Sequence, residues 1–154
     1  MAERRHLPHL LPFARQPIVF LTAVVHGRRA LLANQAAFDC LTKIWRRSAE
    51  IDGWFVGDYL LMPDHLHLFA RSNSAAKPLA KWIEAWKSLS ARHLKAAGLI
   101  TPPLWQRDYF DRFLRSAENY SEKWDYIANN PVRAGLCATP TEWPWRGRLH
   151  DLQF

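Results

Sequence analysis

The sequence predicts an α+β fold of the ferredoxin-like, split βαβ type, followed by an extra C-terminal helix. Segments with strand and helix patterns follow one another in the order strand, helix, strand, strand, helix, strand, helix. Two of these strands are separated only by Pro63 and Asp64, which predicts a hairpin. The chain of 154 residues has no repeat and no long linker, so one domain over 1–154 is expected. Such a sheet is antiparallel, with two helices on one face and the other face left for a ligand or the last helix.

The first half of the chain begins with a strand and a helix. β-branched and aromatic residues after Pro17 predict a strand over 18–25. Asn34 is a suitable N-cap for a helix that runs to about Glu50, with Gly53 just beyond its end. The apolar residues of this segment recur on one stripe, as expected for a helix that covers a sheet.

The central part supplies the hairpin, a second helix and a fourth strand. Apolar-rich runs predict hairpin strands at Trp54–Met62 and His65–Ala70. Pro78 and Gly98 bracket a helix in which apolar residues recur at helical spacing. The mixed aromatic and charged segment Trp105–Leu114 is predicted as the fourth strand.

The last helix is predicted from Ser116 to about Asn129. Pro131 ends it, because the residue before a proline is disfavoured in the α region. Beyond it, the tail with Trp143 and Trp145 around Pro144 is predicted to be irregular.

Composition narrows the class of protein. The longest apolar run is too short to span a bilayer and the N-terminal residues lack an apolar targeting segment, which predicts a soluble, cytoplasmic protein without membrane partners. Cys40 and Cys137 lack any ligand or disulfide-framework spacing, which fits a reducing compartment.

The charge points to a polyanionic partner, with a merely basic solvated surface as the alternative. There are 21 Lys and Arg residues against 14 Asp and Glu, a net charge of +7, and the isoelectric point is near 9.8. Phosphate contacts are expected from basic side chains along the second helix and around the last one: Lys81, Lys87, Arg92, Lys95, Arg107, Arg112, Arg115 and Arg133.

A pair of histidines is the first candidate site. His65 and His67 alternate with Leu66 in a predicted strand, so both imidazoles project from one face while Leu66 and Leu68 face the core. Two convergent imidazoles suit a divalent metal. An isolated pair of this kind also arises by chance on the solvent side of a sheet, so by itself it leaves both interpretations open.

The last helix carries the second candidate. Tyr120, Trp124 and Ile127 form a stripe that should pack on the sheet, and Tyr126 lies roughly 120° away from its centre. Asn130 follows four residues later on the same side as Tyr126. A tyrosine can act as a covalent nucleophile and an amide oxygen can bind a hard cation. Taken alone, however, the two residues favour structural roles, Tyr126 as a partly buried packing residue and Asn130 as a helix terminator before Pro131.

Three motifs in order resemble those of the REP-associated tyrosine transposases, which belong to the single-tyrosine HUH group. They are Leu61–His67 (LMPDHLH), Trp105–Arg115 (WQRDYFDRFLR) and Tyr126–Leu136 (YIANNPVRAGL), and the resemblance covers nearly the whole chain. Joint motifs are far more specific than any one alone.

The resemblance implies an activity and a site. His65 and His67 would bind a divalent metal, Mg²⁺ or Mn²⁺, with Asn130 completing the ligands, and Tyr126 would be the nucleophile. The substrate would be single-stranded DNA with REP-type hairpins, cut through a 5′-phosphotyrosine intermediate and rejoined. The protein would act as a monomer or homodimer in the cytoplasm, associated with the nucleoid.

Two other functions remain open from the sequence: a non-catalytic DNA- or RNA-binding module on the same fold, and a metal-dependent phosphodiesterase that uses activated water. Asp64 is expected to shape the hairpin turn, with orientation of an imidazole as the alternative. For stacking of unpaired bases the sequence favours Trp105, Trp143 and Trp145, because Trp82 and Trp86 fall on a core-facing stripe.

Overall fold

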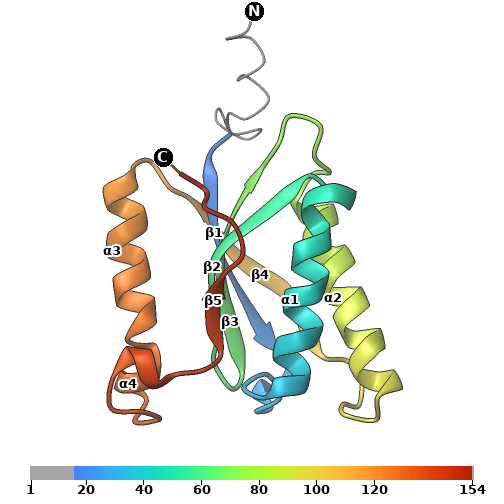
Figure 1. The fold of residues 1–154 in the computed structure, drawn as a ribbon. Coiled ribbons are helices and arrows are strands. Elements are labelled where there is room, and N and C mark those ends of the chain that lie inside the picture. Colours follow the sequence, from blue (N-terminus) through green and yellow to red (C-terminus); the bar gives the residue numbers. More distant parts are fainter. Residues whose placement is uncertain (1–15, 154) are drawn as a thin grey trace, which may run out of the picture.

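A computed structural model describes residues 16–153, and the strands in that range form one antiparallel sheet (Figure 1). Its strand order is β4-β1-β3-β2-β5, and all four strand pairs are antiparallel. The strands are β1 (Ile18–Val25), β2 (Trp54–Leu61), β3 (His65–Ser72), β4 (Trp105–Phe113) and β5 (Arg146–Arg148). The first four strands have the order of a split βαβ fold, which confirms the predicted class.

Helices cover both faces of the sheet. In Figure 1, α1 (Gln35–Ile51) and α2 (Leu79–Ala96) lie on one side, and α3 (Ala117–Ala128) and the short α4 (Asn130–Arg133) lie on the other. Two 3₁₀ turns, η2 (His26–Arg28) and η3 (Pro140–Glu142), complete the described elements. In residues 16–153, no helix is both long enough and apolar enough to cross a bilayer.

The helix boundaries follow from local chemistry that the sequence displays. The Asn34 side chain accepts a hydrogen bond from the Ala37 amide at 2.9 Å and so caps α1. Ser116 caps α3 in the same way, through the Asn119 amide at 3.2 Å. Gly98 follows α2 with a φ of +75°, a conformation that favours glycine. These predicted ends are confirmed to within about a residue or two.

α3 ends near Pro131, as predicted, but the predicted reason is wrong, because Asn130 directly before the proline is itself helical. α3 stops at Ala128, and α4 starts at Asn130 with Pro131 in its first turn. A proline is well tolerated at that position, because the amide it lacks would have no intrahelical partner. Asn130 therefore begins a new helix and does not terminate the old one.

The tail after Gly135 is more ordered than the sequence predicted. β5 pairs with β2 and places Gly147 opposite Tyr59. A Cβ at Gly147 would lie 2.5 Å from the Tyr59 hydroxyl, so only glycine fits this close approach. β5 has only three residues, two of them arginines, so its sequence shows no strand pattern. Its pairing with β2 depends on contacts between residues that are distant in sequence.

The interior is divided by the sheet into two unequal cores. Between the sheet and α1 and α2, the fully buried Trp45, Trp82 and Trp86 pack with the inward residues of β1, β2 and β3. The α3 side holds a smaller cluster around Phe69, Ile127 and other side chains. The two described cysteines, Cys40 and Cys137, are unbonded and partly buried.

Candidate functional site

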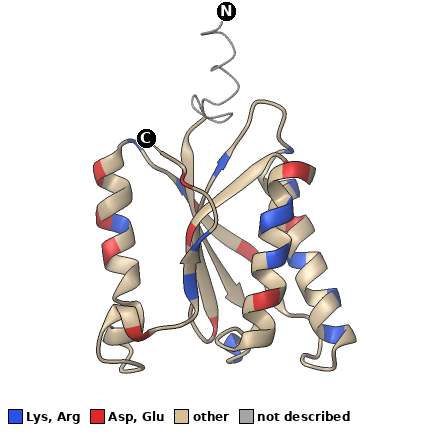
Figure 2. Ribbon diagram, viewed as in Figure 1, with Lys and Arg blue, Asp and Glu red and all other residues tan. Residues whose placement is uncertain are grey.

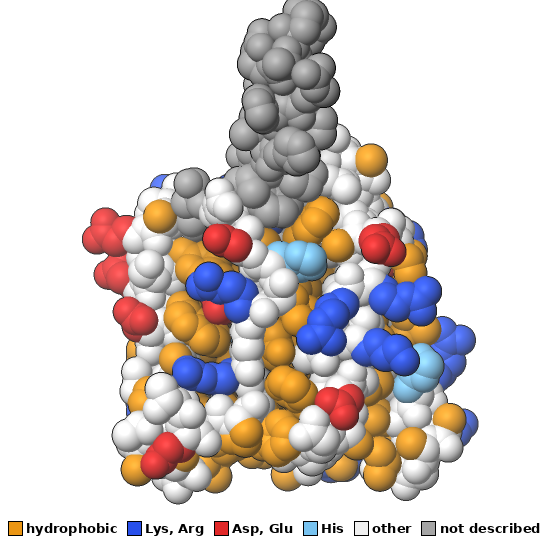
Figure 3. Space-filling view, viewed as in Figure 1, with side chains coloured by type: hydrophobic (Ala, Val, Ile, Leu, Met, Phe, Trp, Pro, Cys, Tyr) orange, Lys and Arg blue, Asp and Glu red, His pale blue; other side chains and the backbone are white. Residues whose placement is uncertain are grey.

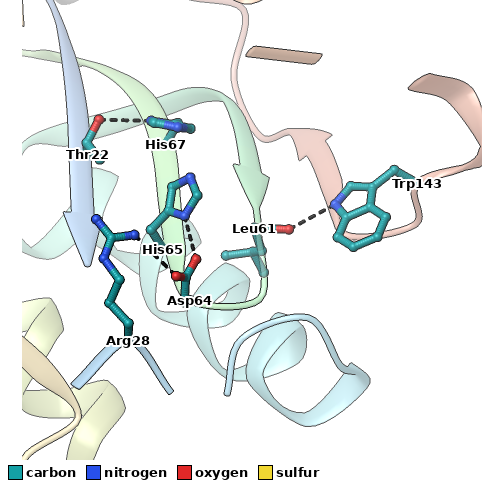
Figure 4. A network of polar contacts seen from close by, with 7 residues as sticks. All are labelled: Thr22, Arg28, Leu61, Asp64, His65, His67 and Trp143. Carbon is teal, nitrogen blue, oxygen red and sulfur yellow. Dashed lines mark hydrogen bonds and ion pairs between the residues drawn. The ribbon is translucent and has the colours of Figure 1, made fainter. Parts of the chain in front are cut away.

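The paired histidines project from β3 on the α3 side of the sheet. Leu66 and Leu68 are fully buried in the core on the α1 and α2 side. His65 and His67 point the other way, with ring centroids 4.9 Å apart and ring planes at 80° (Figure 4). The alternation predicted from the sequence is confirmed.

Each ring is fixed through its Nδ1 atom. His67 Nδ1 lies 2.8 Å from Thr22 Oγ1 on β1, and His65 Nδ1 lies 2.8 Å from Asp64 Oδ1. Arg28 Nη1 donates to the other Asp64 oxygen at 3.2 Å, as Figure 4 shows. Asp64 therefore orients an imidazole, which was the alternative role, in addition to its place in the turn. With both Nδ1 atoms engaged, Nε2 is the nitrogen of each ring that is suited to an external ligand.

The local electrostatics keep His67 in a state that can bind a ligand. Burial, together with the smaller effects of the charges of His65 and Lys123, lowers the pKa of His67 to about 3. Burial alone would raise the pKa of Asp64, but hydrogen bonds from His65 and Arg28 outweigh it and hold that pKa below its ordinary value. His67 is thus neutral and Asp64 is an anion near neutral pH.

These features fit a divalent cation. A neutral imidazole whose Nδ1 is hydrogen-bonded to a carboxylate or hydroxyl is the usual arrangement of a metal-ligating histidine. Within residues 16–153, however, no cluster of three or more His, Cys, Asp or Glu side chains could hold a metal. A third ligand would therefore have to be of another chemical type, such as an amide or phosphate oxygen.

Helix α3 packs on the histidine face through the predicted stripe. The Tyr120 ring stacks on Phe69 of β3 at 4.2 Å between centroids, and Trp124 meets Phe69 edge-on at 6.3 Å. Ile127 is 2% exposed. Tyr126 is off this stripe and 64% exposed, as its helical angle predicts.

Lys123 connects the tyrosine helix with the histidines. Its ammonium lies 5.0 Å from the centroid of the Phe20 ring, and that ring stacks on His67 at 5.4 Å. Tyr126 follows Lys123 by one helical turn, and both line an open cavity of about 580 Å³ between α3 and the end of β4. The phenol and the paired imidazoles therefore belong to the same face of the sheet.

Arg133 holds Tyr126 and Asn130 in a second group. Its guanidinium carbon lies 3.9 Å from the centroid of the Tyr126 ring, and Nη2 donates to the Tyr126 carbonyl at 2.8 Å. The same Nη2 donates to Asn130 Oδ1. The oxygen that the sequence proposes as a metal ligand thus accepts a hydrogen bond from Arg133 in this structure. Arg133 would have to release it before Asn130 could bind a cation.

Residues 17–130 match the family model described as "Transposase IS200 like", which is most of the chain. This chain belongs to the IS200-like transposase family. The two histidines, Tyr126 and Asn130 all fall within the matched range.

Individual relatives of this IS200-like transposase agree with the family assignment. The chain is 25% identical over 130 residues to the REP-associated tyrosine transposase of Escherichia coli K12, covering 82% of this chain and 73% of the relative. A solved structure of a REP-associated tyrosine transposase bound to a REP hairpin matches with a TM-score of 0.71 at 19% identity, over 84% of this chain and 75% of that one. A candidate transposase from Deinococcus radiodurans R1 matches with a TM-score of 0.56 at 24% identity, over 74% and 90%. The two structures show that the fold is shared.

The basic residues predicted to contact phosphate are divided between the two faces of this transposase. Lys81, Arg92 and Lys95 are exposed on α2, on the side away from the histidines. Figure 2 shows basic and acidic positions on α1 and α2, and mostly acidic positions with one basic one on α3. Figure 3 shows Lys and Arg side chains gathered at the right of the view. Arg112 and Arg115 line the cavity beside Tyr126, and Arg107 is exposed on β4.

For Lys87 the predicted phosphate contact is wrong. Its side chain is buried, and its ammonium donates to the carbonyls of Gln106 at 2.9 Å and Asp108 at 3.2 Å. Lys87 thus ties α2 to the backbone of β4. Its spacing along the helix could not distinguish it from the exposed lysines, because its partners lie on the following strand.

The tryptophans favoured for base stacking are also not available as open platforms. Trp105 and Trp143 are each 8% exposed, and their indole nitrogens donate to Ser90 and to the Leu61 carbonyl. Trp145 is half-buried and packs against Phe38 at 5.7 Å. The exposed aromatic side chains near the histidine face include Phe110 and Tyr126. The sequence analysis missed Phe110, because only the pairing of β4 reveals the direction of its side chain.

Proposed function

We propose that this protein cleaves and rejoins single-stranded DNA beside REP-type hairpins, with Tyr126 as the nucleophile. The observation that carries the proposal is that the exposed phenol and the two oriented imidazoles share one face of the sheet. Family membership supports a transposase role, and a relative of the same fold is described as bound to a REP hairpin.

The chemistry is a transesterification at a DNA phosphate. The Tyr126 Oη would attack the phosphorus, forming a phosphotyrosyl ester to the 5′ side as the bond to the 3′ oxygen breaks. The phenolic proton is lost to solvent and the departing 3′ oxygen takes one up, which gives a free 3′-hydroxyl. One phosphodiester is exchanged for another, so a 3′-hydroxyl can reverse the reaction or complete strand transfer without ATP.

His65 and His67 would hold Mg²⁺ or Mn²⁺ through their Nε2 atoms, and Asn130 could join them once Arg133 releases its oxygen. Such an ion supplies charge to a scissile phosphate and offsets the negative charge that develops there. The residues around the site perform the remaining work. Thr22 and Asp64 fix the two rings, and the positive charges of Arg112, Arg115 and Lys123 around the cavity attract the DNA backbone.

Cleavage at one site needs one Tyr126, which a monomer provides, whereas joining two ends at once would require two chains. A chain that acts on hairpins of chromosomal DNA would work in the cytoplasm, at the nucleoid.

The decisive experiment is to trap the covalent product. The wild-type protein is incubated with a labelled REP-type hairpin carrying unpaired flanks, in Mg²⁺ or Mn²⁺, and denatured for electrophoresis. We expect a protein–DNA adduct from wild type, none from Tyr126→Phe, and unchanged hairpin affinity in that variant. Tyr109→Phe is the matched control, because this half-buried tyrosine lies on the opposite face of the sheet, and it should form the adduct normally.

The other outcomes separate the alternatives. Hairpin binding without cleavage by the wild type would identify a non-catalytic binding module. Cleavage that persists in Tyr126→Phe, with no adduct, would identify a phosphodiesterase that uses water. Either result contradicts the proposal.

A further inference from the structure

Strand β4 exposes an aromatic side chain at an open edge of the sheet. Phe110 is 69% exposed, more than any other large hydrophobic side chain that the structure describes. β4 pairs only with β1, so its other side is an edge within the described sheet. Proteins usually protect such edges with charge or bulges and avoid apolar side chains there, because these promote association. An exposed phenylalanine at this place therefore points to a binding role.

The strand register directs Phe110 to the histidine face. Thr22 of β1 is paired with His67 on one side and with Phe110 on the other. Directly paired residues of an antiparallel sheet project from the same face, so these three form one row. The neighbour Tyr109 packs on the α1 and α2 core, which confirms that Phe110 points the other way. Two strand spacings, about 10 Å, separate the backbone of Phe110 from that of His67.

Arg112 lies beside Phe110 on the same face. It pairs with Phe20, the residue whose ring stacks on His67. Arg112 also lines the cavity that contains Lys123 and Tyr126. Three cations, Arg112, Arg115 and Lys123, surround this cavity together with one carboxylate, Glu122. A flat apolar ring next to a net positive cavity complements an unpaired base and its phosphate.

We propose that Phe110 is the stacking platform for an unpaired base next to the cleaved phosphate, and that Arg112 binds the phosphate of that nucleotide. The inference rests on the proposed function, which supplies both the single-stranded DNA ligand and the position of the cleaved phosphate beside Tyr126. An aromatic ring stacks on any base, so this contact holds the strand against the tyrosine without reading its sequence. The alternative occupant of the edge is a β4 strand from a second copy, which the net charge of +7 on each chain disfavours.

The test is a double-mutant cycle that combines a protein variant with a DNA variant, and binding affinity is measured for each combination. All proteins carry Tyr126→Phe so that the DNA stays intact. Single abasic sites are placed at each unpaired position flanking a REP-type hairpin. We expect Phe110→Ala to weaken binding by about 5- to 100-fold. At one flanking position the abasic site should weaken binding similarly, and Phe110→Ala should then cause no further loss.

Two variants serve as controls. Phe110→Trp keeps a stacking surface and should retain the affinity. Ile51→Ala removes another exposed apolar side chain, at the end of α1, and should leave the affinity unchanged. Arg112→Ala should weaken binding and reduce its salt dependence.

Three results would overturn the inference. The first is that the affinity losses from Phe110→Ala and from an abasic site multiply at every flanking position, and the second is that Phe110→Ala leaves the affinity unchanged. The third is that Phe110→Ala changes the oligomeric mass of the protein and not its affinity for DNA. A wild-type adduct combined with multiplying losses would remove the stacking platform and leave the proposed function intact. If the two losses are coupled at one position but the wild type forms no adduct, the stacking platform stands and the proposed function is contradicted. Failure to bind the hairpin would contradict both the stacking platform and the proposed function.

Discussion

The two faces of the sheet differ in what they bury. On the α1 and α2 side, tryptophans are packed edge-to-face and stacked without access to solvent; Trp54 and Trp82, for example, stack at 5.0 Å. On the α3 side, the core is smaller and borders an open cavity, two polar rings and an exposed phenol. The larger buried core and the proposed reaction site are thus separated by the thickness of one sheet. Side chains of β3 point alternately to the core and to the proposed site.

The largest expected effect is a loss of stability from a substitution on the α1 and α2 side of the sheet, where the tryptophans are buried. Trp45 is fully buried and packs against Tyr59 and Trp86 at 5.5 and 5.7 Å. Trp45→Ala should lower the free energy of unfolding by about 3–5 kcal/mol, because it removes a large buried ring and leaves a cavity. Urea denaturation measures this loss. Tyr126→Ala should cost at most about 1 kcal/mol, and equal losses in the two variants would show that the faces are not divided in this way.

A second prediction concerns the pH dependence of stability that arises from the buried imidazole of His67, on the α3 side of the sheet. His67 has a pKa of about 3 in the folded protein and an ordinary value of 6.5 when unfolded. Below that value the unfolded chain binds a proton that the folded chain does not, so stability is full above pH 6.5 and falls as the pH drops toward 3.

In metal-free buffer this group should lower the free energy of unfolding by about 2–3 kcal/mol between about pH 7 and about pH 4.5. Thermal or urea unfolding at several pH values measures it. His67→Asn should lose that part of the pH dependence, and an identical slope in both proteins would mean that His67 is solvated.

The smallest expected effect concerns how α3 is attached to the sheet. The Tyr120 hydroxyl donates to Asp58 Oδ2 at 2.6 Å, and Arg148 of β5 binds both oxygens of the same buried carboxylate at 3.2 Å. Burial, followed by the hydrogen bond and charge of Asp58, raises the pKa of Tyr120, so the hydroxyl stays protonated and donates.

Tyr120→Phe should therefore lower the free energy of unfolding by about 1–2 kcal/mol, because Asp58 keeps Arg148 but loses one donor. Hydrogen exchange should be accelerated in the amides of α3 more than in those of α1. Tyr109→Phe on the other face should change stability by less than about 0.5 kcal/mol. Uniform acceleration over both helices would contradict a local attachment.

The sequence predicted those features that depend on neighbours along the chain. The cap Asn34 follows from local side-chain chemistry. The start of the last helix at about Ser116, the alternation of His65 and His67, and the angle of Tyr126 follow from helix and strand periods. These periods act within a few residues, so they could be applied before the structure was known.

Features that depend on distant partners were missed. The burial of Lys87 requires the carbonyls of β4, and the position of Arg133 over Tyr126 requires that α4 follow α3 directly. The direction of Phe110 requires the register of β4 on β1. In each case the side chain type was visible in the sequence and its partner was not.

The short C-terminal strand also has a consequence for assembly. β5 and the residues that follow it form backbone hydrogen bonds with β2 between Leu60 and Val56. The last of these bonds joins the His150 amide to the Val56 carbonyl at 2.9 Å. One border of the described sheet is thereby closed, and β4 is the border at which another strand could be added. If single-stranded DNA binds beside β4 as proposed, it would cover this border and so hinder the addition of a strand from another molecule.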